Sequence, residues 1–139
     1  MIEIKTPSYD EFMSFTPSHA NILEISEVCN ADIQTVMNVL YNASEVKFGA
    51  YDGDILVCLF GICPDNELWL FFSDKVIYLP MSFYRVAKKF TKDKNLHGKV
   101  YIENKFAIEL VQFLGFKLGE PQPYGLNGNL FMDFTKGGQ

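Results

Sequence analysis

Cysteine and histidine are the residues of this sequence that could act as nucleophiles or as metal ligands. The three cysteines are Cys29, Cys58 and Cys63, and the two histidines are His19 and His97. The spacing of Cys58 and Cys63 is not that of a zinc site, and the histidines lack partners at ligand spacing. Cys58 lies in an apolar run, where a thiol packs as a small hydrophobe. We therefore expect reduced thiols in an intracellular protein, without a metal and without cysteine chemistry.

Basic residues form a second group with chemical potential. Residues 81–92 predict an amphipathic helix that carries Arg85, Lys88, Lys89 and Lys92 on its polar side. Such a group either binds a phosphate-bearing ligand or is the solvated side of the helix. The formal net charge of −5 and the pI of about 4.9 argue against binding of nucleic acid through bulk electrostatics.

Length and composition indicate what must position these residues. The chain has 139 residues, of which 48% are hydrophobic and 15% aromatic, so it can bury a core and is not disordered. We expect a single domain over residues 1–139. No apolar run reaches the roughly 20 residues of a membrane helix, and the first residues lack the pattern of a signal peptide.

The N-terminal third predicts a strand and three helices. Ser8 and Glu11 have the spacing of a capping box, Thr16 before Pro17 is a second helix-start signal, and Asn30 is a third. These signals predict a strand at residues 2–5 and helices at residues 8–15, 17–28 and about 30–40.

Strands dominate the middle of the chain. Asp52-Gly53 is a strong hairpin signal, and the apolar runs 55–62 and 67–72 predict central strands. Strands 67–72 and 99–103 flank a helix and should therefore pair in parallel. The class is α/β (α+β). Further elements are expected as strands at 46–51, 116–118 and 129–135, a helix at 105–114, and a Pro- and Gly-rich loop at 119–128.

A C-terminal segment resembles a known signature. Asn104-Lys105-Phe106-Ala107, followed after seven residues by Gly115-Phe116, is similar to the Asn-x-x-Ala…Gly-Phe segment that closes the domains of GNAT acyltransferases. The order of elements is also similar. The resemblance implies a GNAT-like mixed central sheet of roughly six to seven strands with helices on both faces.

A narrower resemblance covers nearly the whole chain. The segments 15–19 and 22–24, the strand around Trp69 that ends in Ser73-Asp74, and the ending 134–138 resemble small GNAT-like proteins of short-tailed phages. Those proteins are internal virion or head-assembly proteins. The resemblance implies a phage protein located in the host bacterial cytoplasm or associated with the virion, with a virion or host protein as partner and without a membrane.

The GNAT resemblance implies where acetyl-CoA would bind. One strand, here 68–72, separates from its neighbour, here 100–103, and pairs with the pantetheine arm, while a Gly-rich turn holds the pyrophosphate. The corresponding turn at 76–81 contains no glycine, which is a departure from the family pattern. The residues implied in cofactor binding are Leu70, Phe71, Phe72, Arg85, Lys88, Lys89 and Asn104.

The same resemblance implies a general base and a proton donor. Glu103 and Glu67 are the candidates for the base, because they end and begin the two separating strands. Many GNAT enzymes place a proton-donating Tyr where this chain has Val111. Tyr124 and Tyr101 are the possible substitutes. Direct transfer to an amine needs no metal.

Three functions are consistent with these features. The missing glycines and Val111 favour a non-catalytic or weakly catalytic assembly or partner-binding factor in virion morphogenesis. The fold and the basic helix favour an acetyl-CoA-dependent N-acetyltransferase that modifies a host or phage target. The acidic composition is compatible with an inhibitor of a host factor.

Overall fold

The structure is a computed structural model that describes residues 2–74 and 80–137. It contains five helices and eight strands within these ranges. The helices are α1 (Tyr9–Ser14), α2 (His19–Val28), α3 (Ile33–Ala43), α4 (Met81–Thr91) and α5 (Lys105–Phe113). The strands are β1 (Ile2–Lys5), β2 (Val46–Asp52), β3 (Ile55–Ile62), β4 (Leu68–Phe72), β5 (Leu96–Tyr101), β6 (Lys117–Leu118), β7 (Gln122–Tyr124) and β8 (Asn129–Lys136).

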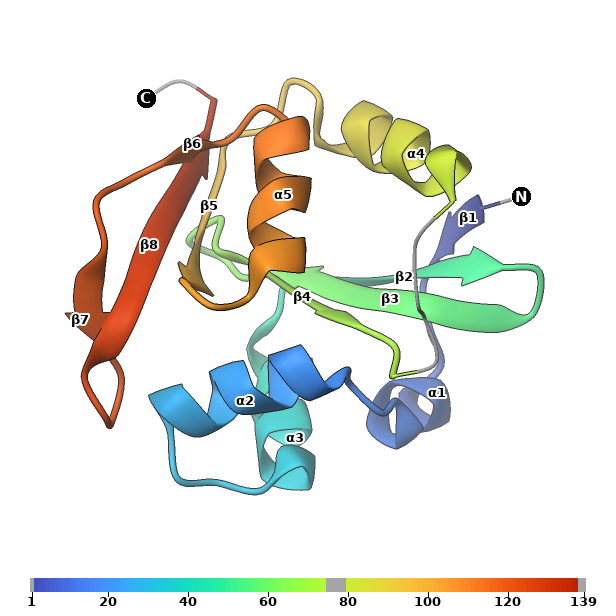
Figure 1. Ribbon diagram of the computed structural model, residues 1–139. Coiled ribbons are helices and arrows are strands. Elements are labelled where there is room, and N and C mark those ends of the chain that lie inside the picture. Colours follow the sequence, from blue (N-terminus) through green and yellow to red (C-terminus); the bar gives the residue numbers. More distant parts are fainter. Residues whose placement is uncertain (1, 75–79, 138–139) are drawn as a thin grey trace.

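The strands form two antiparallel sheets (Figure 1). The first has the order β1-β2-β3-β4, and the second has the order β5-β8-β6 with β7 also paired to β8. The α/β (α+β) class is thus confirmed. The expected single mixed sheet is replaced by these two sheets, because β4 and β5 share only one parallel bridge, between Glu67 and His97.

Helices cover both faces of the first sheet, as expected. In Figure 1, α1, α2 and α3 lie on one side and α4 and α5 on the other. Each side has its own core: Phe12, Met37 and Phe71 are buried on the first side, whereas Phe83 and Leu110 are buried on the second. Burial of these side chains between sheet and helices is the main stabilising contribution. No described helix is long and apolar enough to cross a membrane.

The helix starts follow the capping rules, although two caps differ from the prediction. The capping box of Ser8 and Glu11 is confirmed. The second helix begins at His19 and is capped by Ser18 rather than by Thr16, and the third is capped by Asp32 rather than by Asn30. In both helices the side-chain oxygen of the observed cap accepts a backbone N–H three residues later, which offsets the missing intrahelical bond.

The C-terminal half follows the predicted pattern with two exceptions. The strand expected at 99–103 is β5 (Leu96–Tyr101), so Glu103 lies in the turn after the strand and does not end it. Asn104 caps the start of α5 by accepting the N–H of Ala107. Gly115 follows the C-cap of α5 and has a φ of +92°, which stops the helix. The second exception is the segment 119–128, which was predicted as a loop but contains β7. Its pairing with β8 is a tertiary contact that the Pro- and Gly-rich composition does not indicate.

Candidate functional site

The site lies where β4 and β5 separate, and we call this region the notch. The two strands touch at the Glu67–His97 bridge, where the His97 N–H donates to the Asn66 carbonyl at 3.2 Å. Gly98 allows the backbones to approach here, because a Cβ at Gly98 would lie only 2.7 Å from the Leu68 carbonyl oxygen. Beyond this point the strands share no described bridge, so the notch opens toward the C-terminal ends of both strands.

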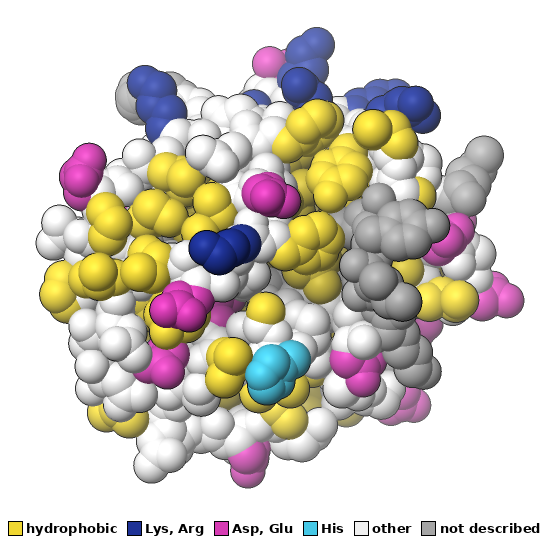
Figure 2. Space-filling view, in the orientation of Figure 1, with side chains coloured by type: hydrophobic (Ala, Val, Ile, Leu, Met, Phe, Trp, Pro, Cys, Tyr) yellow, Lys and Arg dark blue, Asp and Glu magenta, His cyan; other side chains and the backbone are white. Residues whose placement is uncertain are grey.

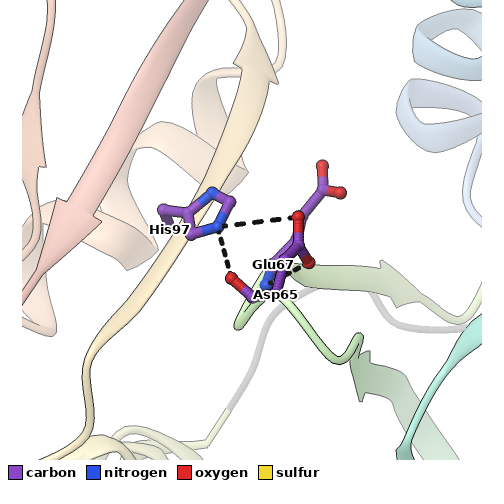
Figure 3. A network of polar contacts seen from close by, with 3 residues as sticks. All are labelled: Asp65, Glu67 and His97. Carbon is purple, nitrogen blue, oxygen red and sulfur yellow. Dashed lines mark hydrogen bonds and ion pairs between the residues drawn. The ribbon is translucent and has the colours of Figure 1, made fainter.

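A polar network holds the closed end of the notch (Figure 3). The His97 Nε2 lies 2.9 Å from the Asp65 carbonyl oxygen and 4.0 Å from Asp65 Oδ2. The Glu67 N–H donates to Asp65 Oδ1 at 3.1 Å. In Figure 3 the Glu67 carboxylate points away from the imidazole. These contacts fix the turn before β4 against β5, which sets the origin of the separation.

A cavity of about 210 Å³ occupies the open part of the notch. Its walls come from α2, α3, β4, β5, β7, β8 and α5, so segments from the whole chain meet there. Most of the lining is apolar, for example Leu68, Leu70 and Val111, and Glu24 contributes a carboxylate from α2. A largely apolar cavity with few polar groups is the usual form of a small-ligand site.

Glu24 is the titratable group whose environment is most unusual within this cavity. Its Oε2 accepts the Tyr101 N–H at 2.8 Å, so α2 is tied to the end of β5. Burial raises the pKa of the Glu24 carboxyl, while the N–H of Tyr101 and the side chains of Asn104 and Asn21 lower it by a smaller amount. A raised pKa makes a carboxylate in a cavity a stronger proton acceptor than an exposed carboxylate.

Asn104 links α5 to the same carboxylate. The residue is 3% exposed, and its Oδ1 caps α5 by accepting the Ala107 N–H at 3.3 Å. Its Nδ2 has no hydrogen-bond partner within the described residues, yet it lies close enough to Glu24 to lower the pKa of that carboxyl. The predicted cap is confirmed, and a role of Asn104 in binding a cofactor stays a prediction.

The C-terminal end of the β4 edge that faces the notch is occupied by the chain itself. Residues Thr16–Asn21, which we call the strap, run along the end of β4 and form an antiparallel bridge between Pro17 and Ser73. The Ser18 N–H donates to the Phe72 carbonyl at 2.7 Å, and the Asp74 N–H donates to the Thr16 carbonyl at 3.0 Å.

The side chain of Asn21 completes this contact. Its Oδ1 accepts the Phe72 N–H at 2.9 Å and the Ser18 hydroxyl at 2.9 Å, and Asn21 is only 1% exposed. Both backbone groups of Phe72 are therefore bonded to the strap. Alternation along an antiparallel strand turns the N–H and C=O of Leu68 and Leu70 toward the same edge, and both of these residues line the cavity.

These contacts test whether the notch fits acetyl-CoA. The GNAT resemblance implies that the pantetheine arm pairs with the edge of β4 toward the turn before α4. The strap already holds the Phe72 N–H, the Phe72 C=O and the Asp74 N–H on that edge. The described residues therefore do not fit the arm in this arrangement. The glycine-free turn 76–81 lies mostly outside the described residues, since 75–79 are not described.

The predicted cofactor residues fall into separate environments. Phe71 and Phe72 are buried in the two cores, whereas Leu70 is half-buried and lines the cavity. Arg85, Lys88 and Lys89 are exposed on α4. The amphipathic pattern predicted for this helix is confirmed, because Phe83 and Thr91 face the core. Whether any of these residues contacts a cofactor stays a prediction.

The predicted acid–base residues are also separate. Glu103 is exposed in the turn between β5 and α5, while Glu67 lies at the closed end of the notch and lines the cavity. Tyr124 in β7 is 38% exposed, lines the cavity and packs its ring against Phe131 at 5.3 Å. Glu67 and Tyr124 thus share the cavity, and Glu103 does not line it.

Two residues of the site were not singled out from the sequence, namely Asn21 and Glu24. In α2, the polar Asn21 is buried while Ile22 and Leu23 are 42% and 45% exposed, which is the reverse of an ordinary amphipathic helix. Hydrophobic periodicity therefore gave no indication of them. The available signal was the Ser18-x-x-Asn21 spacing at the start of the helix.

Comparison with solved structures places the fold among acetyltransferases. An acetyltransferase of the GNAT family from Bacillus cereus superposes with a TM-score of 0.68 at 11% identity, covering 100% of this chain and 99% of that one. An N-acetyltransferase from Staphylococcus aureus gives a TM-score of 0.57 at 14% identity, with 97% and 96% coverage. A proposed acetyltransferase from Salmonella typhimurium, solved with its cofactor acetyl-CoA, gives 0.56 at 11% identity, with 96% and 91% coverage.

These likenesses establish a GNAT fold for the chain. At such low identities they concern the fold alone. No protein-family model matches the sequence, and no curated protein matches it.

Proposed function

We propose that this chain is a partner-binding protein built on a GNAT fold, without acyl-CoA as a cofactor. The observation that carries the proposal is the strap on the edge of β4. Its bonds to Phe72 and Asp74 use the backbone groups with which a pantetheine arm would pair. A fold does not carry its chemistry with it, so the loss of this edge is compatible with a new use of the scaffold.

Displacing the strap would be energetically unfavourable. The strap contributes two backbone hydrogen bonds and one side-chain hydrogen bond to β4, at 2.7–3.0 Å. Each is worth about 0.5–1.5 kcal/mol net, and a buried group left without a partner costs about 1–3 kcal/mol. Asn21 and Phe72 are 1% and 2% exposed, so water does not replace these partners unless the strap moves as a whole. A pantetheine arm would have to replace each hydrogen bond of the strap merely to offset this cost.

The biological setting that we propose is virion assembly in a phage-infected bacterium. Support for it comes from the sequence, through the resemblance of residues 15–19 and 22–24 and of the ending 134–138 to small GNAT-like phage proteins. In that setting the partner is a virion protein or a host protein. Co-purification of a tagged chain from infected cells would identify it, and recovery of the chain without any stoichiometric partner would count against this setting.

Thermal unfolding with acetyl-CoA and with free CoA tests whether the chain binds either compound. A ligand at a hundred times its Kd stabilises a protein by about 2.7 kcal/mol. For this 139-residue chain that amount would raise Tm by about 9 °C. We expect no rise at millimolar concentrations of either compound, with a CoA-binding acetyltransferase as the positive control. A clear rise for this chain would overturn the proposal.

A second candidate function, N-acyl transfer, is favoured by one specific observation. The cavity holds the Glu24 carboxylate, whose pKa is raised by burial and which is bonded to the end of β5. Such a carboxylate could hold a proton taken from an amine. The test is release of the CoA thiol in the presence of a panel of primary amines. Turnover that is lost in Glu24→Gln and retained in Glu103→Gln would establish this function instead.

A further inference from the structure

The outer face of α4 carries a dense group of cations that the fold does not use. Arg85, Lys88 and Lys89 of α4 and Lys92, its C-cap residue, follow one another at helical spacing and are all exposed, and we call them the basic face. Between Arg85 and Lys92 the helix rises about 10 Å, so the four charges lie along two turns. Figure 2 shows Lys and Arg side chains gathered at the α4 edge of the molecule, beside hydrophobic side chains.

This concentration of charge opposes the charge of the rest of the protein. Residues 80–96 contain five of the 12 Lys and Arg but one of the 17 Asp and Glu. The segment therefore has a formal charge of +4, and the remainder of the chain has −9, for a total of −5. An uneven distribution of this size orients an approaching charged partner.

Few of these cations have a partner in the described part of the chain. The Lys88 Nζ lies 5.0 Å from the centre of the Phe113 ring. The ion pairs found among residues 2–74 and 80–137 do not include Arg85, Lys89 or Lys92. By contrast, Lys99 on the second sheet pairs with Asp133 at 2.6 Å. The basic face is thus left available for an anionic group from outside.

Apolar side chains border the basic face. Met81 at the start of α4 is 60% exposed, and Phe113 at the end of α5 is 44% exposed. The Phe113 ring packs edge-on against Tyr84 of α4 at 5.2 Å, which holds it beside the cations. Exposed aromatic and Met side chains next to Arg are typical of the core of protein–protein interfaces.

We propose that the basic face binds an acidic segment of a partner protein that also carries apolar side chains. This inference rests on the proposed function as a partner-binding protein and adds the chemistry of the partner. Complementary charge and the apolar border favour such a segment. A nucleic acid is disfavoured, because a long polyanion would also meet the −9 charge of the remaining surface. A stripe of two turns matches about two turns of an acidic amphipathic helix.

The test uses a fluorescein-labelled peptide of about 12 residues, half Glu and half Leu at helical spacing. Binding is followed by anisotropy at low and at physiological salt, with a single-stranded oligonucleotide of equal charge and free CoA as competitors. One triple variant carries Arg85→Ala, Lys88→Ala and Lys89→Ala. The control triple variant carries Lys5→Ala, Lys105→Ala and Lys117→Ala, which changes the net charge equally elsewhere. Tm values confirm that both variants fold.

We expect the peptide to bind the wild-type chain, with an affinity that falls as salt rises. The first variant should lose about tenfold in affinity and the control less than about twofold. Equal losses in both variants, absence of binding by the wild-type chain, or tighter binding of the oligonucleotide would each overturn the inference. Competition by CoA that the first variant abolishes would instead overturn the proposed function, because the face would then belong to a cofactor site.

Discussion

Replacing Asn21 by Ala removes the side chain that joins the strap to β4. The Asn21 Oδ1 accepts the Phe72 N–H and the Ser18 hydroxyl, both at 2.9 Å, in a position that is 1% exposed. Alanine leaves the buried Phe72 N–H without its acceptor and leaves the volume of an amide group empty. These two losses together should cost about 2–3 kcal/mol of the free energy of unfolding.

The expected change is large enough to measure by thermal unfolding. For a chain of 139 residues, this loss corresponds to a fall in Tm of about 7–10 °C. Asn38→Ala is the matched control, because Asn38 is exposed on α3 and its side chain makes no described hydrogen bond. The control should change stability by less than about 0.5 kcal/mol. Equal Tm values for the two variants would refute the view that Asn21 secures the strap.

Three further perturbations probe the notch and its supports. The folded chain keeps a proton on Glu24 above the ordinary pKa of 4.5, so the wild-type chain should lose stability relative to Glu24→Gln as pH rises from 4.5 through the raised pKa of the folded state. The urea midpoints of the two proteins across this pH range measure this loss of stability. A difference between the midpoints that stays constant with pH would contradict the prediction. Gly98→Ala should lower the free energy of unfolding by about 1–3 kcal/mol, since its Cβ would lie 2.7 Å from the Leu68 carbonyl oxygen. Gly119→Ala is the control, because the nearest atom to its Cβ would be 3.8 Å away, and it should be nearly neutral. Urea unfolding measures both variants. Ser44→Ala should cost about 1–2 kcal/mol, because it removes the acceptor of the Trp69 Nε1–H at 2.7 Å. Urea unfolding of this variant is monitored by the fluorescence of Trp69. An unchanged midpoint would show that this hydrogen bond contributes nothing to stability.

Local signals in the sequence predicted much of the fold. The hairpin at Asp52-Gly53, the amphipathic pattern of α4 and the Asn104 cap all depend on neighbouring residues along the chain, and all three are confirmed. β7 was not predicted, because its strand character depends on β8, which pairs Tyr124 with Asn129. Parallel pairing of β4 with β5 was expected, and it is limited to one bridge between His97 and Glu67, which directly precedes β4.

The site was harder to predict, since it depends on contacts between distant segments. Thr16-Pro17 has the pattern of a helix start, yet Pro17 lies in the strap. The bridge there uses the backbone groups of Thr16 and Ser18, so the missing N–H of Pro17 costs nothing. The burial of Glu24 results from β5 and α5, which lie about 80 residues later in the sequence.

Amide hydrogen exchange at Phe72 reports whether the strap holds the edge of β4. The Phe72 N–H is bonded to Asn21 in the free protein, and we expect that acetyl-CoA does not displace this contact. We predict that the Phe72 amide is protected from exchange, and that its rate is the same with and without millimolar acetyl-CoA. Rapid exchange in the free protein, or a change in rate on adding acetyl-CoA, would contradict the claim that the chain itself occupies the edge of β4.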